Sequence, residues 1–142
     1  MHDTLDLPSL VQAAGDAIIA AGTDGKILLW NPAAERMFGF TAEEALGHAL
    51  ELIIPERLRT RHWEGYQRVM RTGQTRYETE VLRVPALHKD GRALSIAFTV
   101  ALLHAGDGGI QVIAAIIRDE TARWEEERAL RRRLTELEAR SR

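Results

Sequence analysis

The second half of the chain places three β-rich segments in a row, at residues 74–84, 93–103 and 110–117. The middle segment alternates apolar side chains with small or polar ones, which is typical of a strand buried on one face. The last segment is apolar on both faces, which is typical of a central strand. Glycine-containing turns at 89–91 and 106–109 connect the segments. Because strands joined by such short turns pair antiparallel, this half of the chain predicts an antiparallel meander.

The first half supplies two more strands and the helices. Residues 16–21 and 26–30 flank an Asp-Gly turn and predict a hairpin. Capping signals then begin short helices at 32–38 and 41–46, and a longer helix is expected from Pro55 to Gly73. Two strands at the start and three at the end predict one five-stranded antiparallel sheet with helices on one face, an α+β fold.

The end of the chain differs in composition. Residues 120–142 contain neither Gly nor Pro and are dominated by Glu, Arg, Leu and Ala. The leucine spacing of four and three residues predicts an amphipathic helix with a short heptad seam. The seam consists of Leu130, Leu134 and Leu137. We expect this helix to join two copies of the chain in a homodimer.

Composition limits the chain to one ordinary domain. Its 142 residues are 45% hydrophobic and 28% charged, which is a globular balance. We therefore divide the chain into an N-terminal helical cap (1–15), a core domain (16–119) and a C-terminal helix (120–142).

Charge and cysteine content exclude several classes of function. A net charge of −2 favours neither nucleic acid nor an anionic membrane surface. No apolar run reaches the length of a membrane span and no signal pattern begins the sequence, so we expect a cytoplasmic protein. Cysteine is absent, which rules out disulfides, thiolate metal sites and flavin photochemistry through a cysteinyl adduct. Neither a phosphate-binding glycine loop nor a nucleophile elbow appears, so we expect a sensing or binding module rather than an enzyme.

His62 is the residue of greatest interest, because it lies on the face of the 57–70 helix that should be buried. At about 100° per residue, this face is otherwise apolar or aromatic. It carries Leu58, Tyr66 and Val69, with Trp63 and Met70 at its edge. A buried imidazole needs a partner for each ring nitrogen, or its desolvation costs about 1–3 kcal/mol. Either the core supplies polar partners there, or His62 binds a ligand.

The order of the expected elements and four stretches of sequence carry a resemblance to a known family. The stretches are 16-DAIIAAGTDGKILLWNPAAERMFGFTAEEALG-47, 50-LELIIPE-56, 89-KDG-91 and 118-RDET-121. Together they resemble a PAS domain. PAS domains are sensory modules that bind a small molecule or cofactor between sheet and helices. The resemblance also implies dimerisation through flanking helices and a signal passed along the exiting helix, at the start of which Asp119 and Thr121 serve at least as a cap.

Within that family, 59-RTRHWEGYQRVMRTG-73 is similar to the haem-bearing PAS domains of FixL-type oxygen sensors. The similarity implies haem b as cofactor, with His62 as the proximal iron ligand. A neutral imidazole suits that role. Arg68 matches a basic position near the haem propionates, and the alternative interpretation, which we prefer, is a solvated charge on the polar face of the helix. Ile96, Phe98 and Val100 are implied to line the rest of the site.

One position departs from the oxygen-sensing pattern. Those relatives use an arginine on the following strands to steady bound oxygen, whereas this chain has Leu82 there, with Arg83 beside it. Successive strand residues point to opposite faces, so the register decides which of the two faces the pocket. If Leu82 does, carbon monoxide or nitric oxide would be held better than oxygen.

Two functions follow from the sequence. The first is a haem-binding PAS sensor of a diatomic gas or of redox state, which signals through its C-terminal helix to a downstream protein. The alternative is a PAS module without haem that mediates protein–protein interaction and dimerisation or binds a small organic ligand.

Overall fold

Five strands form one antiparallel sheet in the order β2-β1-β5-β4-β3. The computed structural model describes residues 5–141 of the chain. The strands are β1 (Ala17–Gly22), β2 (Ile27–Trp30), β3 (Leu82–Leu87), β4 (Ala93–His104) and β5 (Ile110–Asp119). Strand β5 lies at the centre and joins the hairpin from the first half of the chain to the meander from the second. The α+β fold predicted from the sequence is therefore confirmed.

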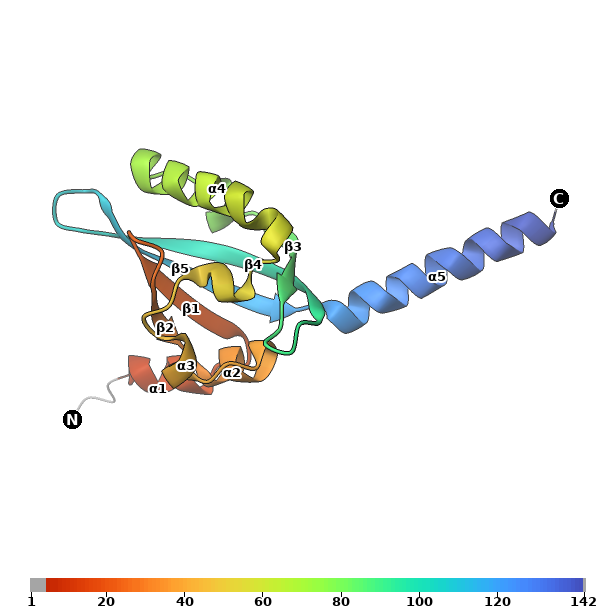
Figure 1. Ribbon diagram of the computed structural model, residues 1–142, viewed down its shortest axis with the longest axis horizontal. Coiled ribbons are helices and arrows are strands. Elements are labelled where there is room, and N and C mark those ends of the chain that lie inside the picture. Colours follow the sequence, from red (N-terminus) through yellow and green to blue (C-terminus); the bar gives the residue numbers. More distant parts are fainter. Residues whose placement is uncertain (1–4, 142) are drawn as a thin grey trace.

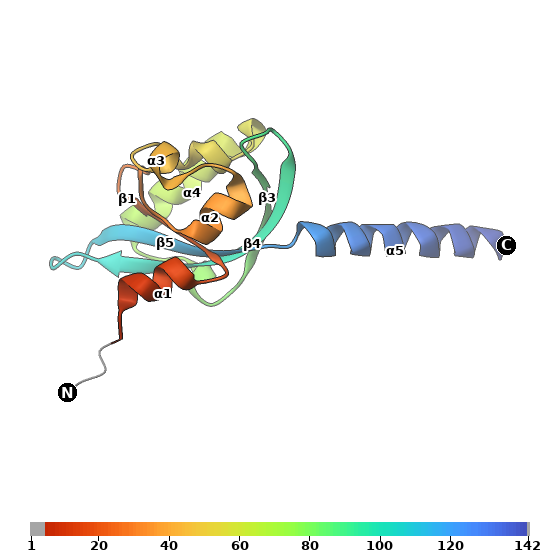
Figure 2. The ribbon, with the colours of Figure 1, turned by 90° about the horizontal axis from the view of Figure 1, so that it is seen from below.

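The helices between β2 and β3 cover one face of this sheet (Figures 1 and 2). The α-helices are α1 (Leu7–Ala13), α2 (Pro32–Phe38), α3 (Ala42–Ala45), α4 (Arg59–Thr72) and α5 (Thr121–Arg140). Three short 3₁₀ helices are η1 (Leu50–Ile53), η2 (Glu56–Leu58) and η3 (Arg76–Glu78). Helix α5 extends away from the sheet into solvent (Figure 1). Among residues 5–141, no helix combines the length and the apolar character that crossing a bilayer requires.

The expected caps are present and tie the N-terminal elements together. Asn31 is fully buried, and its Oδ1 accepts hydrogen bonds from the backbone N–H groups of Ala34 (3.1 Å) and Ile18 (2.9 Å). Its Nδ2 donates to the carbonyl of Val11, so one side chain joins α1, β1 and α2. Thr41 forms the predicted capping box at the start of α3.

Two sequence predictions in the middle of the chain need correction. Residues 74–81 are not a strand, because the Thr75 side chain accepts a hydrogen bond from the Tyr77 N–H and begins the 3₁₀ turn η3. The long helix begins at Arg59 rather than Pro55, since the preceding residues form η2. It ends as expected at Gly73, which has a φ of 71°.

Strand β5 is central as predicted, but only one of its faces is well covered. Ile117 faces the helices and is 3% exposed, whereas its neighbour Ile116 is 45% exposed on the other face. The other face of β5 stays partly exposed because all the helices between β2 and β3 pack on the same side.

The space between sheet and helices is filled at one end and open at the other. Near α2 and α3, Trp30 and Phe38 pack with ring centroids 5.6 Å apart inside a continuous apolar cluster. Near α4, the side chains leave a cavity.

Candidate functional site

A cavity of about 770 Å³ lies between α4 and the sheet. This volume is in the range of small-molecule and cofactor sites. The sheet contributes a wall of twelve apolar residues from four strands: Ile19, Ala21, Leu82, Val84, Pro85, Ala86, Ile96, Phe98, Val100, Ile113, Ala115 and Ile117. The opposite wall is α4, and the loop after α4 closes part of one side.

Nine of the ten residues that the sequence singled out line this cavity. They are Leu58, His62, Tyr66, Arg68, Val69, Leu82, Ile96, Phe98 and Val100. Met70 does not line it, although it is half-buried. One step along a helix turns the side chain by about 100°, which takes Met70 past the face that Val69 presents.

His62 lies in the helical wall with an unpaired polar atom. Its Nδ1 is buried and has no hydrogen-bond partner among the described residues. Burial, the larger effect, lowers the pKa of His62 below its usual value of 6.5, while the Glu51 carboxylate acts in the opposite direction. The neutral imidazole is therefore favoured, and this is the form that binds metal. The core, as far as the structure describes it, does not supply a partner for this nitrogen.

Two aromatic residues of α4 fix the helix around His62. The Trp63 indole N–H donates to Oε1 of Glu51 at 2.6 Å, and its ring lies 4.7 Å from the His62 ring. The Tyr66 hydroxyl donates to the carbonyl of Gly22 in β1. Burial, assisted by the Asp24 carboxylate, raises the pKa of Tyr66 to about 12, so its hydroxyl remains a donor. These bonds anchor α4 to η1 and to β1.

Two arginines of α4 also line the cavity. Arg61 and Arg68 are exposed, and neither forms an ion pair within the part of the chain that the structure describes. They therefore place two uncompensated positive charges beside an apolar interior. A ligand with an apolar body and anionic groups would match this combination.

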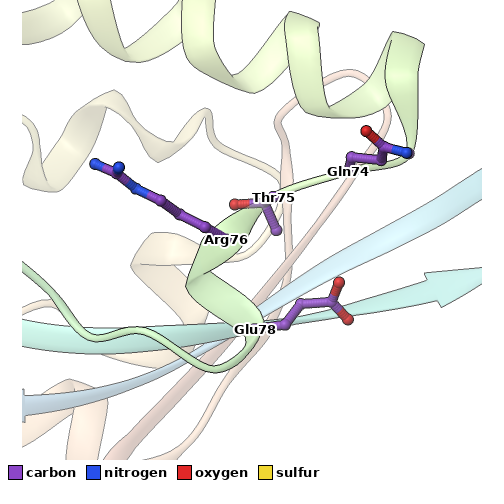
Figure 3. A pocket seen from close by; sticks show the side chains of 5 residues that line it. Gln74, Thr75, Arg76 and Glu78 are labelled. Atoms are coloured by element: carbon purple, nitrogen blue, oxygen red, sulfur yellow. The ribbon is translucent and has the colours of Figure 1, made fainter.

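The loop after α4 lies between the cavity and a second hollow. Gln74 and Thr75 line the main cavity and also a shallow surface hollow of about 540 Å³, together with Gly73, Arg76 and Glu78. Figure 3 shows Arg76 and Gln74 extending in opposite directions from this loop. The surface hollow is formed by five consecutive or nearly consecutive residues, so it is a feature of the loop rather than a second site.

The strand register shows which of Leu82 and Arg83 faces the cavity. Leu82 lines the cavity, while Arg83 lies on the other face of β3, where its Nε is 3.3 Å from Oε2 of Glu120. No arginine enters the cavity from β3. The wall opposite His62 is apolar, and within it no sheet side chain offers a hydrogen-bond donor.

Sequence reasoning missed part of the cavity. Ile19, Ile113 and Ala115 reach the cavity from β1 and β5. Alternation along these strands identifies one shared face, but only the pairing of Ile19 with Ala115 shows that this face meets α4. Gly65 was also missed, because glycine has no side chain and does not contribute to a periodic pattern of apolar residues.

The residues present fit a haem group. The cavity has an apolar interior, one neutral imidazole with a buried unpaired nitrogen, and two arginines for carboxylates. Haem iron needs only one or two protein ligands, because the porphyrin supplies the other four. His62 would be the iron ligand, and Arg61 and Arg68 would meet the propionates.

Comparison with known proteins gives a consistent classification. The sequence model of a family described as PAS fold matches residues 11–125. The oxygen sensor protein DosP of Escherichia coli K12 is 29% identical over 131 residues, which are 90% of this chain and 16% of DosP. The sensor protein FixL of Bradyrhizobium diazoefficiens is 29% identical over 134 residues, 94% of this chain and 25% of FixL.

An uncharacterized protein of Azorhizobium caulinodans is 34% identical over 125 residues, 87% of this chain and 17% of that protein. The chain thus spans a quarter or less of the length of these three relatives. Among solved structures, the PAS domain of a Colwellia psychrerythraea protein superposes with a TM-score of 0.71 at 19% identity. That match covers 81% of this chain and 94% of the other.

Proposed function

Since the chain belongs to the PAS fold family and has sensor proteins among its relatives, we propose that it is a haem-binding sensory domain. Haem b would occupy the cavity between α4 and the sheet, with His62 as the proximal ligand. The domain would sense a diatomic gas or the redox state of the iron and pass the signal through α5.

The unpaired Nδ1 of His62 carries this proposal. A buried ring nitrogen without a partner costs about 1–3 kcal/mol, which an ordinary core residue would avoid. Here the imidazole lies in the wall of a cavity that its neighbours leave open. An iron bond at Nδ1 would give this nitrogen its missing partner, and the porphyrin would cover the apolar walls of the cavity. A haem group held by His62 in this cavity would supply iron chemistry that can bind a diatomic gas.

The protein's own contribution to ligand choice comes from the sheet. Leu82 and the other strand residues that line the cavity all have apolar side chains. Oxygen bound to haem is stabilised by a nearby hydrogen-bond donor, whereas carbon monoxide depends on one much less. The domain is therefore expected to hold carbon monoxide or nitric oxide better than oxygen.

The exit helix favours a dimer as the signalling unit. Leu130, Leu134 and Leu137 are 66%, 57% and 50% exposed along one seam of α5. Two copies that pair along this seam would cover these leucines and form a short parallel coiled coil. The downstream protein that reads α5 would then contact the paired helices.

An absorption spectrum of the purified chain, before and after addition of haemin, tests the proposal. We expect a strong Soret band after haemin is added, and we expect His62→Ala to shift or remove it. His104→Ala is the matched control, because His104 is exposed at the end of β4. A mixture that shows only the spectrum of free haemin would contradict haem binding and favour the alternative, a PAS module for dimerisation or for a small organic ligand.

A further inference from the structure

Gly65 occupies a position where glycine has no local benefit. It lies in the middle of α4, three residues after His62, and lines the cavity. Glycine is among the least favourable residues in a helix interior, because it loses more backbone freedom than other residues when it is ordered.

The surrounding protein does not require this glycine. Gly65 is absent from the glycines with positive φ, so its backbone conformation is open to any residue. A Cβ built on Gly65 has no heavy atom within 4 Å among the described residues, apart from its own helix backbone and chain neighbours. Gly25 provides the contrast, because it has a φ of 77° and a Cβ there would collide with the Trp63 ring.

The helical surroundings of Gly65 all face the cavity. On a helix surface a residue is adjacent to those three and four positions away. For Gly65 these neighbours are Arg61, His62, Arg68 and Val69, and all four line the cavity. Gly65 is therefore the centre of the α4 surface that a ligand would meet.

We infer that Gly65 is a ligand-contact position, at which a flat apolar ligand lies directly against the backbone of α4. The inference rests on the proposed function of the cavity and adds a determinant of ligand shape. A side chain at this position would project into the space between His62 and the two arginines. The missing side chain thus sets the width of the cavity and favours a planar ligand such as a porphyrin over a rounded one.

Two substitutions separate this role from a structural one. Gly65→Ala should raise the melting temperature of the ligand-free chain by about 3 °C, because alanine favours the helix and meets no clash. The Gly65→Leu variant should also fold. Its affinity for the ligand should fall at least tenfold, because the leucine side chain occupies the part of the cavity that the ligand needs. Gln67→Leu is the control, since Gln67 is exposed on the same helix and does not line the cavity.

The probes are haemin and metal-free protoporphyrin IX, each titrated into the full chain and followed by absorbance and by fluorescence of the free porphyrin. We expect Gly65→Leu to lower the affinity for both probes. We expect His62→Ala to lower the affinity for haemin much more than the affinity for the metal-free porphyrin. If the wild type binds haemin and Gly65→Leu binds it equally well, the inference is wrong and the proposed function stands. If Gly65→Ala lowers the melting temperature, the glycine is structural and the inference is again wrong. A wild type that binds neither probe would overturn both.

Discussion

Leu82 and Arg83 are consecutive residues of β3, yet Leu82 lines the cavity and Arg83 pairs with the residue that precedes the exit helix. Leu82 lines the cavity, and Arg83 pairs across the other face with Glu120, the residue immediately before α5, at 3.3 Å. The same junction is bound to β4, because the Ser95 N–H donates to the Thr121 hydroxyl at 2.9 Å and the Ser95 carbonyl accepts from the Glu120 N–H at 2.8 Å. A displacement of β3 by a ligand would therefore reach the start of α5 directly.

Loss of the Arg83 ion pair should alter signal transfer with little effect on stability. Arg83 is 62% exposed, and exposed pairs contribute about 0–1 kcal/mol. We expect Arg83→Ala to leave ligand affinity unchanged and to reduce the ligand-dependent change in hydrogen exchange in the first turn of α5. The control is Arg76→Ala, which breaks the exposed pair with Glu80. An undiminished exchange response in Arg83→Ala would show that β3 does not carry the signal.

A donor introduced from β3 should change the choice of gas. In the haem-loaded ferrous chain, Leu82→Arg would place a guanidinium in an otherwise apolar wall. One charge-assisted hydrogen bond is worth about 1.5–3 kcal/mol, so oxygen should dissociate about tenfold more slowly or better, with a smaller effect on carbon monoxide. Stopped-flow dissociation rates provide the measurement. Val81→Arg, at an exposed neighbouring position, should have no such effect; equal effects on the two gases would contradict the assigned face of Leu82.

The ligand-free chain should lose stability on acidification through His62. Burial lowers the pKa of His62 in the folded state, whereas the unfolded chain has the usual value of 6.5. Between these two values the unfolded state binds more protons, so the free energy of unfolding falls as the pH drops below about 6.5. Urea unfolding from pH 5 to 8 should show a steeper fall for the wild type than for His62→Phe. His104→Phe should retain the wild-type slope, and identical slopes for wild type and His62→Phe would argue against a buried neutral imidazole.

The Tyr66 hydroxyl should contribute a measurable part of the stability of the cavity wall. Tyr66→Phe removes its hydrogen bond to the Gly22 carbonyl, which still accepts from the Gly25 N–H at 3.0 Å. We expect a loss of about 0.5–1.5 kcal/mol in the free energy of unfolding. Tyr77→Phe, whose hydroxyl accepts only from the adjacent Arg76 guanidinium, should cost much less. Equal losses would mean that Tyr66 does not anchor α4 to β1.

Local signals in the sequence predicted most of the fold. Asn31 and Thr41 cap helices as their side-chain chemistry requires, and the alternation in β4 identifies the face on which Ile96 and Phe98 meet the helices. These caps and alternating patterns involve residues only a few positions apart, and the folded chain retains them. Two features did not follow from such patterns. The Thr75 side chain begins a 3₁₀ turn through a local bond to the Tyr77 N–H where the composition predicts a strand, and Ile116 faces outward because the helices pack on the other face of β5.

Helical periodicity in the sequence predicted which residues of α4 line the cavity. His62, Tyr66 and Val69 share a face in the sequence and in the structure, and Met70 was assigned to that face only because the edge of a helical stripe is not sharply defined. The walls from β1 and β5 depend on strand pairing across the whole chain, which no local pattern contains.

The central claim is that His62 binds haem iron, and the resonance Raman spectrum of the ferrous, haem-loaded chain tests it most directly. We expect an iron–histidine stretching band in the wild type, its loss in His62→Gly, and its return when imidazole is added to His62→Gly. A wild-type spectrum without this band, or a band that persists unchanged in His62→Gly, would contradict the claim.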